Sequence, residues 1–388
     1  MTGATTTDTM VLDRSIIICC GSGGVGKTTI AAAFALQAAR LGRTACVVTI
    51  DPARRLANSL GLDALSNRPT RIEGPWPGEL HAMMLDPKRT FDDLVARYSD
   101  SAEQAEDIKV NRIYRNLTGT LSGTQEYMAM EKLYELVEEG GFDLVVVDTP
   151  PTRNALDFLD APRRLTRFLE NRLFQALMMP TRAGLRIMGV AAHALLRTIS
   201  KVAGADIVAD AVAFFQAFEG MEEGFRARAA RVRELLAQPE TAFVLVASPR
   251  PDSVDEAVHF AGKLAESNLS VTALVVNRVQ PRFADDSQLD ALDALATLSA
   301  GVDGGADRDL DELVENLRGY TAASDREELA YGDLVSRVAP APVARVPLLN
   351  TDVHDLDNLA TIADLLSGGA GPAAESSDGP SGRPSGGR

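Results

Sequence analysis

GSGGVGKT, residues Gly21–Thr28, is the stretch that decides how the rest of the chain folds. It matches the pattern G-x-x-x-x-G-K-[ST], in which glycines let successive backbone N–H groups converge on phosphate oxygens. A β-branched run, Ser15–Cys20, precedes it, and the Ala-rich segment Ile30–Leu41 that follows favours a helix. A helix in that place aims its positive end at bound phosphates. Strand, loop and helix together predict a site for the phosphates of a nucleotide.

The residue types in this loop assign roles. The loop residues predicted to bind nucleotide are Gly21, Ser22, Gly23, Gly24, Val25, Gly26, Lys27, Thr28 and Thr29. Lys27 is expected to reach the β- and γ-phosphates and so to act in catalysis, while the hydroxyl of Thr28 is expected to bind Mg²⁺.

Short β-branched runs recur along the chain and end in polar residues. After the first come Ala45–Ile50, Asp143–Val147, Phe243–Ala247, Val271–Val276 and Val343–Val346. Continuous apolar runs separated by helical stretches are typical of a parallel sheet covered on both faces. The predicted fold is therefore an α/β P-loop NTPase with a mostly parallel, doubly wound sheet and a helical subdomain inserted in it. Its ligand is expected at the carboxyl ends of the strands.

Two aspartates follow such runs. Asp148 is expected to hold Mg²⁺ through a water, and Asp51 to position the attacking water or to act as its base. A helix cap after a strand is the structural alternative for each.

The segment Asn277-Arg278-Val279-Gln280 bears on the base of the nucleotide. A GTPase of this plan would present Asn-Lys-x-Asp, whose last carboxylate pairs with guanine, and that acid is absent here. Asn277 can hydrogen-bond an adenine edge, so the predicted cofactors are ATP and Mg²⁺.

Composition predicts one large domain with tails. Residues 1–14 are polar and are expected to be a disordered tail, as are the Gly/Pro/Ser-rich residues 367–388. Between them, 15–366 is predicted to be the ATPase domain. Long, mostly helical stretches at about 91–140 and 155–238 exceed simple crossovers and are expected to be its helical insertions.

Charge and cysteine content narrow the function classes. The net charge of −15 argues against a chain that coats nucleic acid. The three cysteines, Cys19, Cys20 and Cys46, show no metal-ligand spacing, and residues 1–14 lack the apolar core of a signal peptide. We therefore expect a cytoplasmic protein, with contact at a membrane surface as an alternative.

Several motifs in order resemble the arsenical-pump-driving ATPase family, which includes the ATPase of tail-anchored-protein targeting. They are GSGGVGKTT (21–29), TIDPARRLANSLG (49–61), MLDP (84–87), VVVDTPPTRNALDFL (145–159), VVNRV (275–279) and RVPLL (345–349). The resemblance implies that Asp51 lies in a first switch region and that a second begins at Asp148. It also implies that Pro347 and Leu348 lie over the adenine. Such proteins work as dimers in which ATP closes the dimer and remodels a helical surface.

Ser22 departs from that family, which has a second lysine at this position that reaches the partner's phosphates. A serine supplies no such cation. One reading is a heterodimer with a paralogue that bears the lysine. The other is that this member tolerates the loss, or that another arginine replaces the lysine. With no thiols in the helical region, arsenite transport and a shared zinc are not expected.

A basic amphipathic stretch, 161–201, carries eight basic residues and one acid, a local charge of +7. The candidate client-binding residues within it are Phe168, Leu169, Leu173, Phe174, Leu177, Met178 and Met188. The stretch would fit a hydrophobic segment, an acidic protein partner or anionic lipid. The alternative is that its apolar stripe is the core of the subdomain.

Together these features predict a dimeric switch ATPase that couples nucleotide state to binding of a client through the helical subdomain. One alternative is a regulatory subunit that binds ATP with little hydrolysis of its own, which Ser22 would explain. Another is a membrane-associated partition or cell-division ATPase, although the C-terminal stretch Thr351–Leu366 is acidic rather than basic. The expected partners are a paralogous subunit and a hydrophobic or acidic protein, and no nucleic acid.

Overall fold

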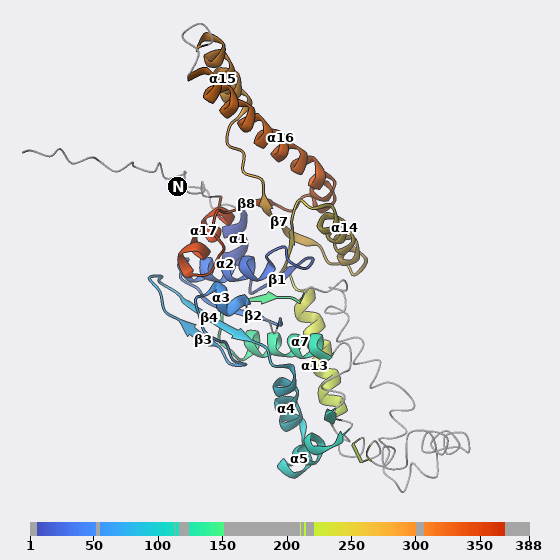
Figure 1. The fold of residues 1–388 in the computed structure, drawn as a ribbon. Coiled ribbons are helices and arrows are strands. Elements are labelled where there is room, and N and C mark those ends of the chain that lie inside the picture. Colours follow the sequence, from blue (N-terminus) through green and yellow to red (C-terminus); the bar gives the residue numbers. More distant parts are fainter. Residues whose placement is uncertain are drawn as a thin grey trace, which may run out of the picture.

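An eight-stranded sheet forms the centre of the computed structural model of the chain (Figure 1). The structure describes residues 6–51, 55–112, 114–115, 124–150, 210, 213–214, 221–299 and 306–368. The strand order is β3-β4-β2-β5-β1-β6-β7-β8, and neighbours are parallel except for the antiparallel pair β3–β4. The predicted α/β fold with a mostly parallel sheet is therefore confirmed.

The strands predicted from apolar runs all form. They are β1 (Ile16–Cys20), β2 (Thr44–Thr49), β5 (Leu144–Asp148), β6 (Thr241–Ala247), β7 (Val271–Val279) and β8 (Val343–Pro347). The central strands β1, β5 and β6 are buried along their whole length, which explains why their sequences are apolar without alternation. Two strands at one end of the sheet, β3 (Thr70–Ile72) and β4 (Glu79–Met84), were not predicted.

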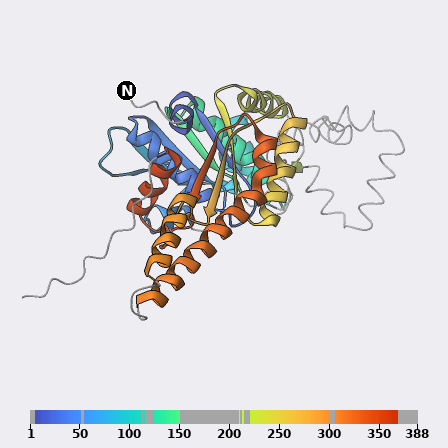
Figure 2. The same cartoon turned by 90° about the horizontal axis from the view of Figure 1, so that it is seen from above.

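Helices cover both faces of the sheet (Figure 2). One face packs against α1 (Thr6–Asp13), α2 (Lys27–Arg40), α3 (Arg55–Ser59) and α17 (Leu356–Leu366). The other packs against α4 (Pro87–Tyr98), α7 (Thr124–Glu138), α13 (Glu222–Ala237), α14 (Pro251–Glu266) and α16 (Ala306–Val338). Alternate residues of β1 serve the two cores: Ile16 and Ile18 face the second set of helices, and Ile17 faces the first.

The N-terminal segment is not a tail throughout, so the prediction of disorder over 1–14 was wrong for residues 6–13. They form α1, which buries Met10 and Val11 against α2. Ser367 donates a hydrogen bond to Asp8 at 2.7 Å and so joins α1 to the end of α17. The segment is mostly polar, so a packed helix with two buried apolar side chains was not expected from its composition. Of the tail predicted over 367–388, the part after Gly368 lies outside the described residues.

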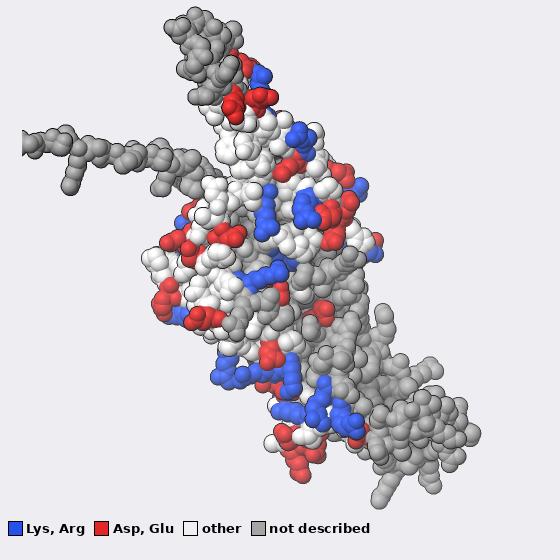
Figure 3. Space-filling model, viewed as in Figure 1, with Lys and Arg blue, Asp and Glu red and all other residues white. Residues whose placement is uncertain are grey.

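Helices occupy what is described of the predicted insertions. The first region contains α4, α5 (Ala102–Val110) and α7, and it begins at Pro87, before the expected residue 91. In the second region, α13 is the principal part that the structure describes. The seven candidate client-binding residues belong to this region but lie outside the described residues. On the face shown in Figure 3, Lys and Arg gather over the α4–α13 end of the molecule, with the acidic residues of α5 beside them.

A helical hairpin that the sequence did not predict stands away from the sheet (Figures 1 and 2). It comprises α15 (Asp286–Ser299) and α16, and an ion pair of 2.8 Å between Arg282 and Asp325 holds the segment before α15 against α16.

Within the described ranges, no helix is long and apolar enough to cross a membrane.

Candidate nucleotide-binding site

The loop between β1 and α2 lies in close contact with the neighbouring strand ends. Gly21 has a φ of 150°, and a Cβ atom there would lie 2.0 Å from the carbonyl oxygen of Val246. Gly26 has a φ of 93°, and a Cβ atom there would lie 2.3 Å from Nδ2 of Asn277. Glycine is required at both positions because any side chain would push the loop away from β6 and β7.

Side-chain donors hold three backbone carbonyls of this loop. Lys27 Nζ donates to the carbonyl of Ser22 at 2.7 Å, and Asn277 Nδ2 donates to that of Val25 at 2.7 Å. Arg278 Nη1 donates to the carbonyl of Gly24 at 3.2 Å. The C=O and N–H of a planar trans peptide point in opposite directions. Fixing the carbonyls therefore fixes where the N–H groups of the loop point, as an anion site requires.

A buried carboxylate lies beside the loop. Asp148 Oδ2 accepts hydrogen bonds from Thr28 Oγ1 at 2.7 Å and from Thr49 Oγ1 at 2.8 Å. Its Oδ1 is buried and has no partner among the described residues. Burial raises the pKa of Asp148, while the two hydroxyls and the nearby Lys27 oppose that rise. The side chain is thus an anion that its surroundings satisfy only in part.

This arrangement fits Mg²⁺. The ion prefers oxygen ligands, keeps several waters and takes only one or two groups from the protein. Thr28 Oγ1 and the unpartnered Oδ1 of Asp148 are such oxygens. No cluster of three or more His, Cys, Asp or Glu that could hold a metal occurs in the described part of the chain. A site made of one carboxylate, one hydroxyl and nucleotide phosphates needs no such cluster.

Lys27 lies in the same buried environment. Desolvation lowers the pKa of its ammonium, and the negative charge of Asp148 counteracts this. Its hydrogen bond to a loop carbonyl satisfies one of its three donors. A phosphate in the loop would supply the anionic partner that this buried cation favours.

Asp51 follows β2 at the mouth of the site. Its backbone N–H donates to Thr49 Oγ1 at 3.2 Å, and its partly buried side chain lines the same cavity as Lys27 and Thr28. The structure therefore brings Asp51, Lys27, Thr28 and Asp148 together at the carboxyl edge of the sheet.

A cavity of about 450 Å³ opens over this edge. Its lining includes the predicted residues Gly24, Gly26, Lys27, Thr28, Thr29, Asp51, Asn277, Pro347 and Leu348, together with Arg55 and Thr149. The backbone N–H of Leu348 donates to the carbonyl of Val279 at 2.9 Å, which fixes the segment after β8 beside the end of β7. The volume is within the range of small-molecule sites.

Ser22 faces away from this cavity. Its Oγ lies 3.2 Å from Oγ of Ser253, which in turn accepts a hydrogen bond from the backbone N–H of Ser248 at 3.0 Å. Ser22 and Gly23 line a second cavity of about 560 Å³ with Arg250, on the other side of the loop. The serine thus tethers the loop to the start of α14.

Two contributors to the site were missed as functional residues. Thr49 reaches Asp148 because β2 and β5 pair in the register Thr49↔Asp148, which apolar runs alone cannot specify. Arg278 reaches the loop because the chain turns at a bulge. Its position directly after Asn277 was the available signal.

The three cysteines are buried in β1 and β2. Burial raises the pKa of each thiol, that of Cys20 to about 12, so they stay protonated near neutral pH. In these buried strand positions the cysteines act as small apolar side chains of the core.

Comparison with known proteins agrees with this geometry. Residues 14–296 match the family described as anion-transporting ATPase. The chain is 33% identical over 269 residues to an uncharacterized protein of Streptomyces coelicolor, an alignment that covers 69% of this chain and 63% of that one. It is 26% identical over 287 residues to the ATPase GET3B of Arabidopsis thaliana, covering 69% and 64%. Over 152 residues it is 30% identical to the ATPase get3 of Aspergillus terreus, covering 38% and 43%. The aligned parts thus span less than two thirds of these relatives.

Proposed function

The chain belongs to the anion-transporting ATPase family, and from this premise we propose that it binds Mg²⁺ and ATP in the cavity over the sheet edge and hydrolyses the ATP. The observation that carries this proposal is the buried Asp148, with one oxygen bonded to Thr28 and Thr49 and the other unpartnered. Asp148 has no ion pair among the described residues, and its hydrogen-bond partner Thr28 lines the cavity, so a metal ion bound there would meet an available carboxylate oxygen.

The proposed roles follow from position. Thr28 and Asp148 would hold Mg²⁺, which supplies electrostatic stabilisation of the phosphates when bound. Lys27 would leave the Ser22 carbonyl and bind the β- and γ-phosphates. Asp51 would orient a water whose oxygen bonds to the γ-phosphorus as the bond to the β–γ bridging oxygen breaks, giving ADP and phosphate.

The family's adenine-side elements are the basis for proposing ATP rather than GTP. Asn277 lies between the loop and the cavity, and Gln280 stands where a guanine-reading carboxylate would be. Pro347 and Leu348 line the same cavity.

Phosphate release and nucleotide binding, measured on the same preparations, test the proposal. We expect the wild-type chain to bind a non-hydrolysable ATP analogue. The Asp51→Asn variant should bind it within about three-fold of wild type but turn over ATP at least about 100-fold more slowly, since it cannot orient the water. Failure of the wild-type chain to bind the analogue would refute the proposal. Equal turnover in both proteins would refute the role of Asp51.

The coupling of nucleotide state to a client, and the dimer, remain part of the same proposal. Support comes from the resemblance and from the basic stretch 161–201 in a chain of net charge −15. For Ser22 we propose a heterodimer in which a paralogue with a lysine at this position supplies the missing cation. Turnover measured with the chain alone and mixed with its nearest paralogue tests this, because full activity alone, unchanged by mixing, would contradict it.

A regulatory subunit with little hydrolysis of its own is the second candidate. The observation that favours it is the contact of Ser22 with Ser253, which directs the side chain away from the nucleotide cavity. ATP binding with negligible turnover, both alone and with a paralogue, would select it.

A further inference from the structure

Arg278 has a backbone conformation that its side chain does not favour. Its φ is 62°, in the left-handed region, and it lies where the register between β7 and β8 shifts between Asn277 and Val279. The other non-glycine residue with positive φ in the described chain, Asn268, lies in the turn after α14 and is of a type that tolerates it. Strained residues of this kind persist where neighbouring structure enforces them, often at binding sites.

The contacts around Arg278 show what enforces the strain. Its backbone N–H donates to Oδ1 of Asn277 at 3.0 Å, while Nδ2 of Asn277 donates to the Val25 carbonyl. Its guanidinium donates to the Gly24 carbonyl at 3.2 Å. The side chain therefore runs from the end of β7 to the phosphate loop, although much of it is exposed to solvent.

Apolar groups line the same cavity as Arg278. Leu348 is 53% exposed and lines the cavity together with Pro347. Leu348 is fixed beside the end of β7 by its hydrogen bond to Val279, one residue after Arg278. The lining of the cavity thus combines a planar cation with uncovered apolar surface.

We propose that Arg278 forms one wall of the slot for the nucleotide base, with its guanidinium plane stacked on the purine ring and Leu348 against the other face. Guanidinium planes stack well on aromatic rings, and flat rings gain further from apolar cover. The Gly24 hydrogen bond holds the plane in place before the base arrives, which reduces the entropy lost on binding. The inference rests on the proposed nucleotide binding and adds a residue that determines base affinity.

Inorganic tripolyphosphate separates this role from that of a phosphate-binding cation, because it carries the phosphates without a base. The Arg278→Gly variant is suitable because glycine accepts a φ of 62° without strain, so that the fold should be retained. We expect it to bind a non-hydrolysable ATP analogue about ten-fold more weakly, in keeping with the loss of one base-stacking group. Its affinity for tripolyphosphate, measured by competition, should stay within about two-fold of wild type, because Lys27 and Asn277 still hold two of the three loop carbonyls.

Two further variants sharpen the test. Arg278→Lys keeps the charge and lacks the plane, so it should resemble Arg278→Gly. Arg250→Met removes a cation that lines the other cavity and pairs with Asp252, so it should bind both ligands like wild type.

The inference would be overturned if both ligands weakened equally in Arg278→Gly, if neither changed, or if Arg278→Lys bound the ATP analogue like wild type. A wild-type chain that bound neither ligand would instead refute the proposed function itself.

Discussion

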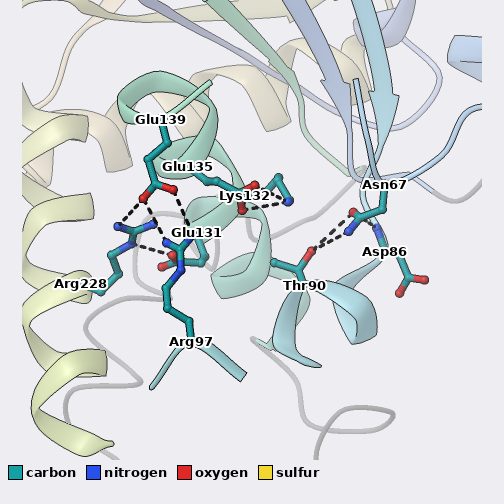
Figure 4. A network of polar contacts seen from close by, with 9 residues as sticks. All are labelled: Asn67, Asp86, Thr90, Arg97, Glu131, Lys132, Glu135, Glu139 and Arg228. Atoms are coloured by element: carbon teal, nitrogen blue, oxygen red, sulfur yellow. Dashed lines mark hydrogen bonds and ion pairs between the residues drawn. The ribbon is translucent and has the colours of Figure 1, made fainter. Parts of the chain in front are cut away.

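Two buried carboxylates on neighbouring elements differ in how their charge is compensated. Asp148, at the end of β5, is bonded by two hydroxyls and keeps one unpartnered oxygen near a cavity. Glu131, in α7, accepts a hydrogen bond from Arg228 of α13 at 2.6 Å, and both side chains are almost fully buried (Figure 4). Asp148 leaves a carboxylate oxygen that could bind an incoming cation, whereas Glu131 is already paired with the cation Arg228.

The surroundings of Glu131 show that its site is structural. Arg228 also lies 3.6 Å from Glu139, and its guanidinium carbon lies 3.8 Å from the ring centroid of Tyr134. Arg97 of α4 makes two hydrogen bonds to Glu139, at 3.1 and 3.0 Å. This ion-pair network joins α4, α7 and α13 and so fixes these three helices to each other. Glu131 Oε2 lacks a hydrogen-bond partner among the described residues just as Asp148 Oδ1 does, so the two sites differ in the counter-cation and in the adjoining cavity rather than in an unpartnered oxygen.

Removing the cation of the network should have the largest effect. Arg228→Met leaves Glu131 buried without its counter-charge, and we expect a loss of about 3–5 kcal/mol in the free energy of unfolding at neutral pH. Urea unfolding measures it. The double variant Arg228→Met/Glu131→Leu should recover most of the loss, because no buried charge is left alone. A double variant as unstable as the single one would show that packing rather than charge explains the effect.

Neutralising Asp148 should affect function instead. Asp148→Asn is expected to lower ATP turnover by about 100-fold or more, roughly 2.7 kcal/mol in the activation free energy, because Mg²⁺ loses its carboxylate. Its free energy of unfolding should equal or exceed that of wild type, since a poorly compensated buried charge is gone. A marked loss of stability would place Asp148 with Glu131 as a structural residue.

The pH dependence of stability distinguishes the two sites further. Because burial raises the pKa of Asp148, its contribution to stability is complete below the unfolded pKa of about 4 and is lost as pH rises through the folded pKa. The stability advantage of Asp148→Asn should therefore grow from about pH 4 to pH 7. The penalty of Arg228→Met should shrink on acidification, since Glu131 becomes protonated and needs no cation. Unfolding curves across this range provide the measurement, and parallel pH profiles would contradict the account.

The exposed part of the network should matter least. Arg97 and Glu139 are 42% and 46% exposed, so water already solvates both charges. Arg97→Met is expected to reduce the free energy of unfolding by less than about 1 kcal/mol. A loss comparable to that of Arg228→Met would mean that the network acts as one unit, which a double-mutant cycle would reveal as strong coupling.

The sequence predicted the sheet and most of the candidate site because local patterns determine them. Apolar runs mark buried parallel strands, and the glycine spacing of the loop marks a phosphate site. Strand β3 was missed because it has only three residues, and β4 because its sequence ELHAMM contains no β-branched residue. Helix α1 was missed because only two of its residues are buried apolar side chains.

Other features depend on contacts between distant segments. The Thr49–Asp148 bond needs the register of β2 and β5, and the Arg228–Glu131 pair joins residues 97 positions apart. The role inferred for Arg278 needs the bulge after Asn277 and a left-handed φ. No motif encodes these relations in a single sequence.

The central claim is that the unpartnered oxygen of Asp148 serves the metal of a bound nucleotide. Calorimetric titration of a non-hydrolysable ATP analogue, with Mg²⁺ or with EDTA, into wild type and Asp148→Asn tests it most directly. We expect Mg²⁺ to strengthen wild-type binding by about ten-fold or more and to change binding to Asp148→Asn by less than about three-fold. Equal gains from Mg²⁺ in both proteins, or none in wild type, would contradict the account.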